Sequence, residues 1–113
     1  MSSDFDRAAQ LVELLDAASI TATMDPRSAT PPCVLVTPPN FEDDLACGET
    51  AEWHLWILAP TTANADAWKA LGDLRVAVRD TIGYRRADFA SYSLSPDTPP
   101  LPAYHVTFSE GID

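Results

Sequence analysis

Residues 31–39 read PPCVLVTPP, a short apolar strand between two proline pairs. Because proline has no backbone N–H to donate to a β-ladder, the two pairs predict where the strand 33–37 begins and ends. The first pair also favours extended backbone just before the strand. We interpret a strand bounded so firmly as one that controls an edge of the sheet, as in chains that pair or pack with copies of themselves.

The 113 residues are enough for one domain, 1–113, with an expected radius of gyration of about 13 Å. A core of that size suits one sheet with one or two helices. The chain contains neither a run of 18 apolar residues nor a charged-then-apolar leader. We therefore expect no membrane span and no signal peptide, and a chain that stays in a cytoplasm.

The net charge is -10, from 17 acidic and 7 basic side chains. Specific binding to duplex nucleic acid is not expected, because it depends mostly on Lys and Arg at phosphates. Residues 1–52 carry ten acidic and two basic side chains, a net charge of -8, whereas residues 53–113 carry seven and five, a net charge of -2. The basic side chains of the second half, which predict a basic pole, are Lys69, Arg75, Arg79, Arg85 and Arg86.

The first half of the chain begins with apolar residues at steps of three and four, which predict an amphipathic helix over 4–18 with Phe5 in its apolar stripe. Alternating β-branched residues predict a strand over 20–25, and a turn over 25–28 precedes the proline-bounded strand 32–37. The acidic stretch 38–50 is interpreted as a loop.

The second half is predicted to contain a strand over 51–59, a helix over 63–82 and strands over 87–94 and 103–109, the last two separated by a proline-rich loop. Gly83 is placed to end the helix in a left-handed cap. The expected fold is α/β in the α+β sense. It is a single domain with a mixed or antiparallel sheet of about five strands packed with two helices, in the order α-β-β-β-α-β-β.

Periodicity assigns Trp53 and Trp68 to the core. Both faces of the strand 51–59 are largely apolar, so a helix or a neighbouring subunit should cover each of them. Trp56 shares its face with His54. It is either a core residue or part of a contact between subunits, where aromatic side chains are enriched.

No motif of catalysis is present, since the four glycines are isolated and the spacings of hydrolases, zinc proteases and Ca²⁺ loops are absent. We therefore expect no enzyme activity, no cofactor and no metal. Neighbouring strand residues point to opposite faces, so Tyr104 and His105 cannot act on one atom. Cys33 and Cys47 are expected to be free, partly buried thiols, with a 33–47 disulfide as the alternative.

The order of these elements, together with PPCVLVTPP (31–39), AEWHLWILAP (51–60) and PAYHVTF (102–108), resembles the tail terminator proteins of long-tailed, siphovirus-type bacteriophages. The similarity is greatest to those of phages that infect actinobacteria. It covers residues 4–109 and lies in strand patterns, not in a catalytic signature.

The resemblance implies a structural virion protein, six copies of which form a ring on the head-proximal end of the tail. The homo-hexameric ring caps the tail tube protein, stops its polymerisation and joins the tail to the head-tail connector or stopper protein. DNA passes through the lumen without specific binding, and no membrane is involved. The expected location is the virion, after assembly in the host cytoplasm.

Two sets of residues are assigned to this role as hypotheses. A head-to-tail ring needs two different, complementary patches on each subunit. The residues predicted to face a neighbouring subunit are Arg75, Arg79, Arg85, Arg86 and Trp56. The residues predicted to lie at the lumen or the tube contact are Glu42, Asp43, Asp44 and Glu49. The run 42–44 is also interpretable as a divalent-ion site or as a solvated loop. The arginines are also interpretable as a solvated helix end.

Two alternatives remain for the whole chain. The first is another head-tail connector, head-completion or tail-tube-like protein, which shares the ring but occupies a different level of the stack. The second is a small acidic cytoplasmic binding domain or enzyme, which a monomer with a small-molecule pocket would favour.

Overall fold

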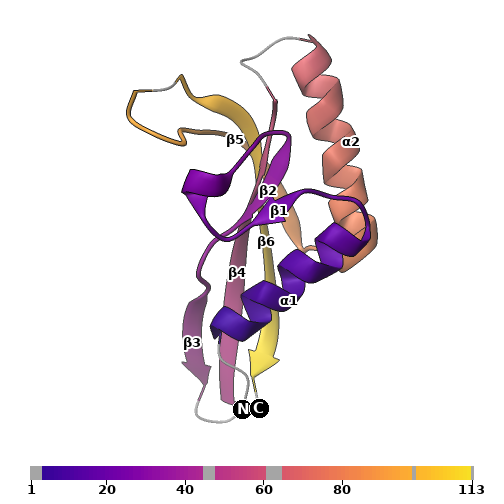
Figure 1. The fold of residues 1–113 in the computed structure, drawn as a ribbon. Coiled ribbons are helices and arrows are strands. Elements are labelled where there is room, and N and C mark those ends of the chain that lie inside the picture. Colours follow the sequence, from indigo (N-terminus) through magenta and orange to yellow (C-terminus); the bar gives the residue numbers. More distant parts are fainter. Residues whose placement is uncertain (1–3, 45–47, 61–64, 98, 113) are drawn as a thin grey trace.

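Two helices lie against one face of a six-stranded sheet in the residues that the structure, a computed structural model, describes: 4–44, 48–60, 65–97 and 99–112 (Figure 1). The elements in chain order are α1 (Asp4–Ala17), β1 (Ala22–Thr23), a 3₁₀-helix (Pro26–Ser28), β2 (Cys33–Val36), β3 (Asn40–Asp44), β4 (Gly48–Leu58), α2 (Ala65–Ile82), β5 (Arg86–Tyr92) and β6 (Leu101–Ile112). The predicted α+β class is confirmed, with one strand more than expected. Neither of these helices is long and apolar enough to cross a membrane.

The strand order is β1-β2-β4-β6-β5, and β3 pairs with β4 on the same side as β2. The β1–β2 pair is parallel and the other pairs are antiparallel. Because β4 is long, β2 pairs with residues 55–58 and β3 with residues 48–52. The two short strands therefore follow one another along one edge of β4.

The second proline pair separates β2 from β3 by a bulge. Val36 lies opposite Leu55 and Asn40 opposite Glu52, so three residues, 37–39, face two on β4. Both the backbone N and the Oγ1 of Thr37 donate to the carbonyl oxygen of His54, which anchors the bulge. The extra residue changes which side chains point to each face of the sheet. Even-numbered residues of β3 therefore lie on the same face as odd-numbered residues of β2.

The proline pairs end β2 as predicted, but the prediction that this strand controls an edge is wrong. β1 supplies a parallel partner, with Ala22 opposite Val34 and Thr23 opposite Leu35, so β2 lies inside the sheet. All four residues of β2 are buried. The prolines define the length of an internal strand, since they flank its ladder without interrupting it.

The predicted loop 38–50 is also wrong, because it contains β3 and the start of β4 (Figure 1). Asp and Glu are depleted in strands, so the many acidic residues in 42–49 did not indicate a β-hairpin. The two strands of the hairpin are nevertheless paired through their backbones. This hairpin, with the end of β6, extends the molecule to 47 × 29 × 23 Å. The radius of gyration is accordingly 14.4 Å, above the value expected from length.

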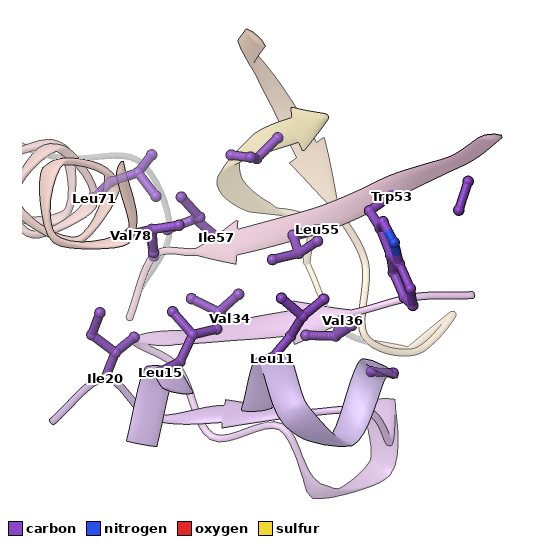
Figure 2. Close-up of a cluster of buried hydrophobic side chains, with 14 of the residues drawn as sticks. Leu11, Leu15, Ile20, Val34, Val36, Trp53, Leu55, Ile57, Leu71 and Val78 are labelled. Atoms are coloured by element: carbon purple, nitrogen blue, oxygen red, sulfur yellow. The ribbon is translucent and has the colours of Figure 1, made fainter. Parts of the chain in front are cut away.

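The larger core cluster lies between the helices and the sheet, and a smaller cluster of Cys33, Leu58 and Ala103 lies on the other face. Figure 2 shows Leu11 and Leu15 of α1 close to Val34 and Val36, and Val78 of α2 close to Ile57. Trp53, with 1% of its surface exposed, is the largest fully buried side chain and confirms the predicted core role. The end of α2 is also as predicted, since Gly83 has a φ of 72° and its N–H donates to the carbonyl of Arg79.

Trp68 is not a core residue, because 73% of its surface is exposed. The buried stripe of α2 begins instead at Ala67 and continues through Leu71 and Val78. Positions 67 and 68 both satisfy the steps of three and four, and the packing of the helix on the sheet selected the smaller side chain. Phe5, predicted in the stripe of α1, is likewise 67% exposed.

Glu110 of β6 ties the end of the core to α1. Its carboxylate accepts hydrogen bonds from Arg7 Nε at 2.9 Å, from Arg7 Nη2 at 3.1 Å and from the indole Nε1 of Trp53 at 2.9 Å. The buried indole N–H is therefore satisfied by a partly exposed carboxylate, as buried polar groups require.

Candidate functional site

The face of the sheet turned away from the helices carries the aromatic and polar side chains that alternate with core residues. In β4, His54 and Trp56 alternate with the buried Trp53, Leu55 and Ile57. The strand register places Trp56 opposite His105. On the other side of β6, His105 lies opposite Asp88. Three neighbouring strands thus contribute to one cluster.

Four rings form a continuous row on this face. The Trp56 and His105 rings are stacked, with centroids 4.4 Å apart and planes 10° apart. His54 stacks on His105 at 4.9 Å, and Tyr92 of β5 meets Trp56 at 4.9 Å with a 46° tilt. We call Tyr92, Trp56, His105 and His54 the ring row. Each ring is half-buried, so each keeps an accessible edge.

The two histidines are joined by a hydrogen bond of 2.7 Å between His54 Nδ1 and His105 Nε2. The other nitrogen of His54, Nε2, lies 3.0 Å from the Glu52 carboxylate and 3.1 Å from the Asn40 side-chain amide. Of the two nitrogens in this hydrogen bond, His54 Nδ1 and His105 Nε2, one carries the proton and the other accepts it.

The surroundings oppose the charged form of His105. Burial lowers its pKa, and the neighbouring His54 lowers the pKa further. Asp88 and Glu52 act in the opposite direction and are the weaker influences. The centre of the ring row therefore disfavours a positive charge on His105, and the carboxylates of Glu52 and Asp88 lie at its border.

The surroundings of the two imidazoles can be stated for the described residues. Neither imidazole hydrogen bonds to a hydroxyl or a thiol in the described part of the chain. No group of three or more His, Cys, Asp or Glu side chains among the described residues could hold a metal ion. Cys33 is free and buried beneath this face, where desolvation raises the pKa of its thiol. Cys47 lies outside the described residues.

The predicted basic pole is divided by the structure. Arg75 turns inward, donating to the Tyr84 hydroxyl at 2.7 Å and lying 5.8 Å from the centre of the Tyr104 ring. Arg79 remains exposed at the end of α2, 3.4 Å from Asp80. Arg86 begins β5, and Arg85 directly precedes it, with its backbone N–H donating to the carbonyl oxygen of Thr107 at 2.9 Å.

Arg85 and Arg86 border a shallow groove of about 230 Å³ together with Glu52 of β4 and three residues of β6, Thr107, Phe108 and Ser109. Arg86 pairs with Asp88 of its own strand at 2.9 Å. The groove adjoins the ring row, since Thr107 lies opposite His54. Arg85 and Arg86 are thus next to Trp56's face of the sheet, and Arg75 and Arg79 are not.

The predicted acidic set occupies a hairpin and not a loop. Glu42 lies opposite Thr50, Asp43 opposite Glu49, and the backbone of Asp44 opposite Gly48. Glu42 therefore faces away from the helices and Asp43 toward the helix side. Desolvation raises the pKa of Glu49, and the hydrogen bond and charge of Asp43 raise it further.

Sequence reasoning missed the histidine pair. The alternation placed His54 with Trp56 on one face and His105 with Thr107 on one face, but no spacing in the sequence relates residues 51 positions apart. The register of β4 against β6 brings them together. A pairing of the two strands in the correct register would have revealed the cluster.

The chain matches no protein-family model, no curated protein and no solved structure. The arrangement of its own residues is therefore the basis for a functional proposal.

Proposed function

We propose that this chain is a ring-forming structural protein of the phage tail terminator type. Six copies would cap the tail tube, stop its polymerisation and join the tail to the head-tail connector protein. The observation that carries the proposal is the separation of charge across the sheet: Glu42 and Asp43 lie on β3 at one side, and Arg85 and Arg86 at the start of β5 on the other. A head-to-tail ring needs two such different and complementary patches on one subunit.

The ring row supports the same function. Aromatic side chains are enriched in the centres of protein contacts, and polar groups are enriched at their rims. The half-buried rings of Trp56 and Tyr92, bordered by Glu52 and Asp88, have this arrangement. In the proposed ring this face contacts the tube or the connector protein.

The overall charge is consistent with a channel for DNA. A subunit with a net charge of -10 gives the ring a negative field, which repels phosphates and keeps DNA from adhering to the lumen. The acidic residues of the hairpin that are not used in the contact between subunits would line such a channel or contact the tube.

Cryo-electron microscopy of phage particles that contain this chain tests the proposal. We expect a six-fold ring between the tail tube and the head connector, into which the structure fits with its hairpin toward the lumen or the tube. Absence of the chain from particles, together with a stable monomer in solution, would contradict the proposal and favour the small acidic binding domain.

A further inference from the structure

On one side the sheet ends in β1, beside β2, and further along β4 in β3; on the other side it ends in β5. Within the described residues, β3 pairs with β4 and with no other strand, and β5 pairs with β6 and with no other strand. Each therefore presents a row of backbone N–H and C=O groups on its outer side, which is a template for pairing with another strand.

The directions of the two edges are compatible. β3, β4, β6 and β5 follow one another across the sheet, and each neighbouring pair is antiparallel. β3 and β5 consequently run in opposite directions. When two copies stand side by side in the same orientation, β5 of the first meets β3 of the second as an antiparallel pair.

The side chains of the two edges are complementary in one register. With Glu42 opposite Arg86, Asp43 lies opposite Arg85 and Asn40 opposite Asp88. Glu42 and Arg86 both lie on the helix-free face. Asp43 lies on the helix side, whereas Arg85 directly precedes β5 and borders the groove with Arg86, so these two charges are near one another but are not on one face. Opposite charges directly across a strand pair are favourable.

The same register brings together two exposed aromatic side chains. Phe41 and Phe89, which are 47% and 65% exposed, both lie on the helix side of their strands. In the register defined by Glu42 and Arg86, Phe41 is opposite Ala87 and diagonal to Phe89, within reach of an aromatic contact. Placing Phe41 directly opposite Phe89 would instead set Glu42 against Asp88, a repulsive pair.

We propose that β3 of one copy adds to the start of the β5 edge of the next copy as an antiparallel strand, with Glu42 opposite Arg86 and Phe41 opposite Ala87. Copies of the chain then join head to tail into one continuous sheet, which closes if the rotation per copy permits. This contact deepens the proposed function, since it is the contact on which the ring would rest.

A charge swap tests the contact. One variant carries Glu42→Arg and Asp43→Arg, and the other carries Arg85→Glu and Arg86→Glu; all four side chains are exposed. Multi-angle light scattering of the full chain should show assemblies for the natural sequence and a monomer for each variant alone. A one-to-one mixture of the variants should recover the assemblies, because each junction then pairs opposite charges.

Matched controls carry the same charge changes away from the edges. Lys69→Glu, on α2, and Glu13→Arg with Asp16→Arg, on α1, should assemble like the natural sequence. Circular dichroism and urea midpoints verify that every variant is folded. A natural chain that stays monomeric, a swap variant that assembles alone, or a mixture that remains monomeric would each overturn the contact.

Cross-linking tests the register without charge reversal. In a background with Cys47→Ser, Glu42→Cys in one copy and Arg86→Cys in another should form a disulfide on mild oxidation, because the Cα atoms of directly opposite residues are about 4.5–5.5 Å apart, within the range that a disulfide spans. Ser91→Cys, on the other face of β5, should not cross-link to Glu42→Cys. Equal cross-linking of both pairs would overturn the register.

The failure of this contact can be distinguished from the failure of the terminator role. Six-fold rings in phage particles that persist with both swap variants would overturn the strand contact and leave the role intact. Assemblies that obey the charge swap, in a chain absent from phage particles, would support the contact and overturn the role.

Discussion

The two faces of one sheet behave differently although the same strands build both. On the helix side, Trp53, Leu55 and Ile57 are removed from solvent by α1 and α2. His54 and Trp56, the neighbours of Leu55 in β4, point to the other face and lie half-exposed in a row with His105. The period of two in a strand therefore places most of the core on one face and the partly exposed rings on the other, where only Cys33, Leu58 and Ala103 form a buried cluster.

The two ends of the sheet also differ in the side chains that they carry on the helix side. Beyond the reach of α1 the helix side becomes acidic, with Asp43 opposite Glu49 on the projecting hairpin. The core thus occupies one end of the sheet, and the other end offers charge and open backbone. Stability and assembly should accordingly respond to different substitutions.

The largest effect is expected from the tryptophans. Trp53→Ala should lower the free energy of unfolding by about 3–5 kcal/mol, because it empties a fully buried site. Trp68→Ala, at an exposed site, should change it by no more than about 0.5 kcal/mol. Urea denaturation measures both, and equal losses would contradict the assignment of Trp53 to the core and Trp68 to the surface.

A smaller effect is expected at the link between the helix and the sheet. Glu110→Ala should lower the free energy of unfolding by about 1–3 kcal/mol, since the buried indole N–H of Trp53 loses its acceptor. Arg7→Ala should cost less, because the Arg7–Glu110 ion pair is partly exposed and screened by solvent. A double-mutant cycle with Trp53→Phe should show coupling to Glu110→Ala, and strict additivity would contradict the contact.

The helix-free face should make stability depend on pH through His105. Its pKa in the folded chain is below the ordinary value of 6.5, so the unfolded chain binds more protons as the pH falls. The contribution of His105 to the free energy of unfolding is therefore present above pH 6.5 and is lost as the pH falls below 6.5. The free energy of unfolding then falls by at most about 1.4 kcal/mol per pH unit for one proton.

His105→Phe should flatten this dependence, because it keeps a ring on Trp56 and removes the titrating group. Urea denaturation between about pH 8 and pH 5.5 measures the slope, and Glu49→Gln serves as a variant on the opposite face. A slope unchanged in His105→Phe would show that another group is responsible.

The smallest effect is expected on the acidic hairpin. Glu49→Gln removes a carboxylate from opposite Asp43 and should slightly raise stability at neutral pH. The pKa of Glu49 is higher in the folded chain than in the unfolded chain, so ionisation of Glu49 opposes folding at neutral pH. The gain should disappear in acid, and a loss of stability at neutral pH would contradict the repulsion.

Much of the fold could be predicted from local pattern. Apolar steps of three and four located α1 and α2 within a few residues, and alternation located β4 and the core role of Trp53. Local pattern could not choose between Ala67 and Trp68 as the first buried residue of α2, because both satisfy the helical period. Nor could it detect β3, whose acidic side chains contradict the usual composition of a strand.

The candidate site was predictable in its parts but not as a whole. Trp56, Arg85 and Arg86 were selected from the sequence, and the structure places all three along the helix-free side of the sheet or its border. Arg75 was selected with them and turned inward to Tyr84 and Tyr104. The contacts of a long side chain depend on the neighbours that folding brings to it.

The sequence by itself determined the fold class, the ends of β2, the cap at Gly83 and the uneven distribution of charge, because each follows from residue chemistry over a few positions. Tertiary structure alone decided that β2 is internal, that β3 and β4 form an edge hairpin, and that His54 meets His105. These depend on strand order and register, which are set by how distant segments share one core.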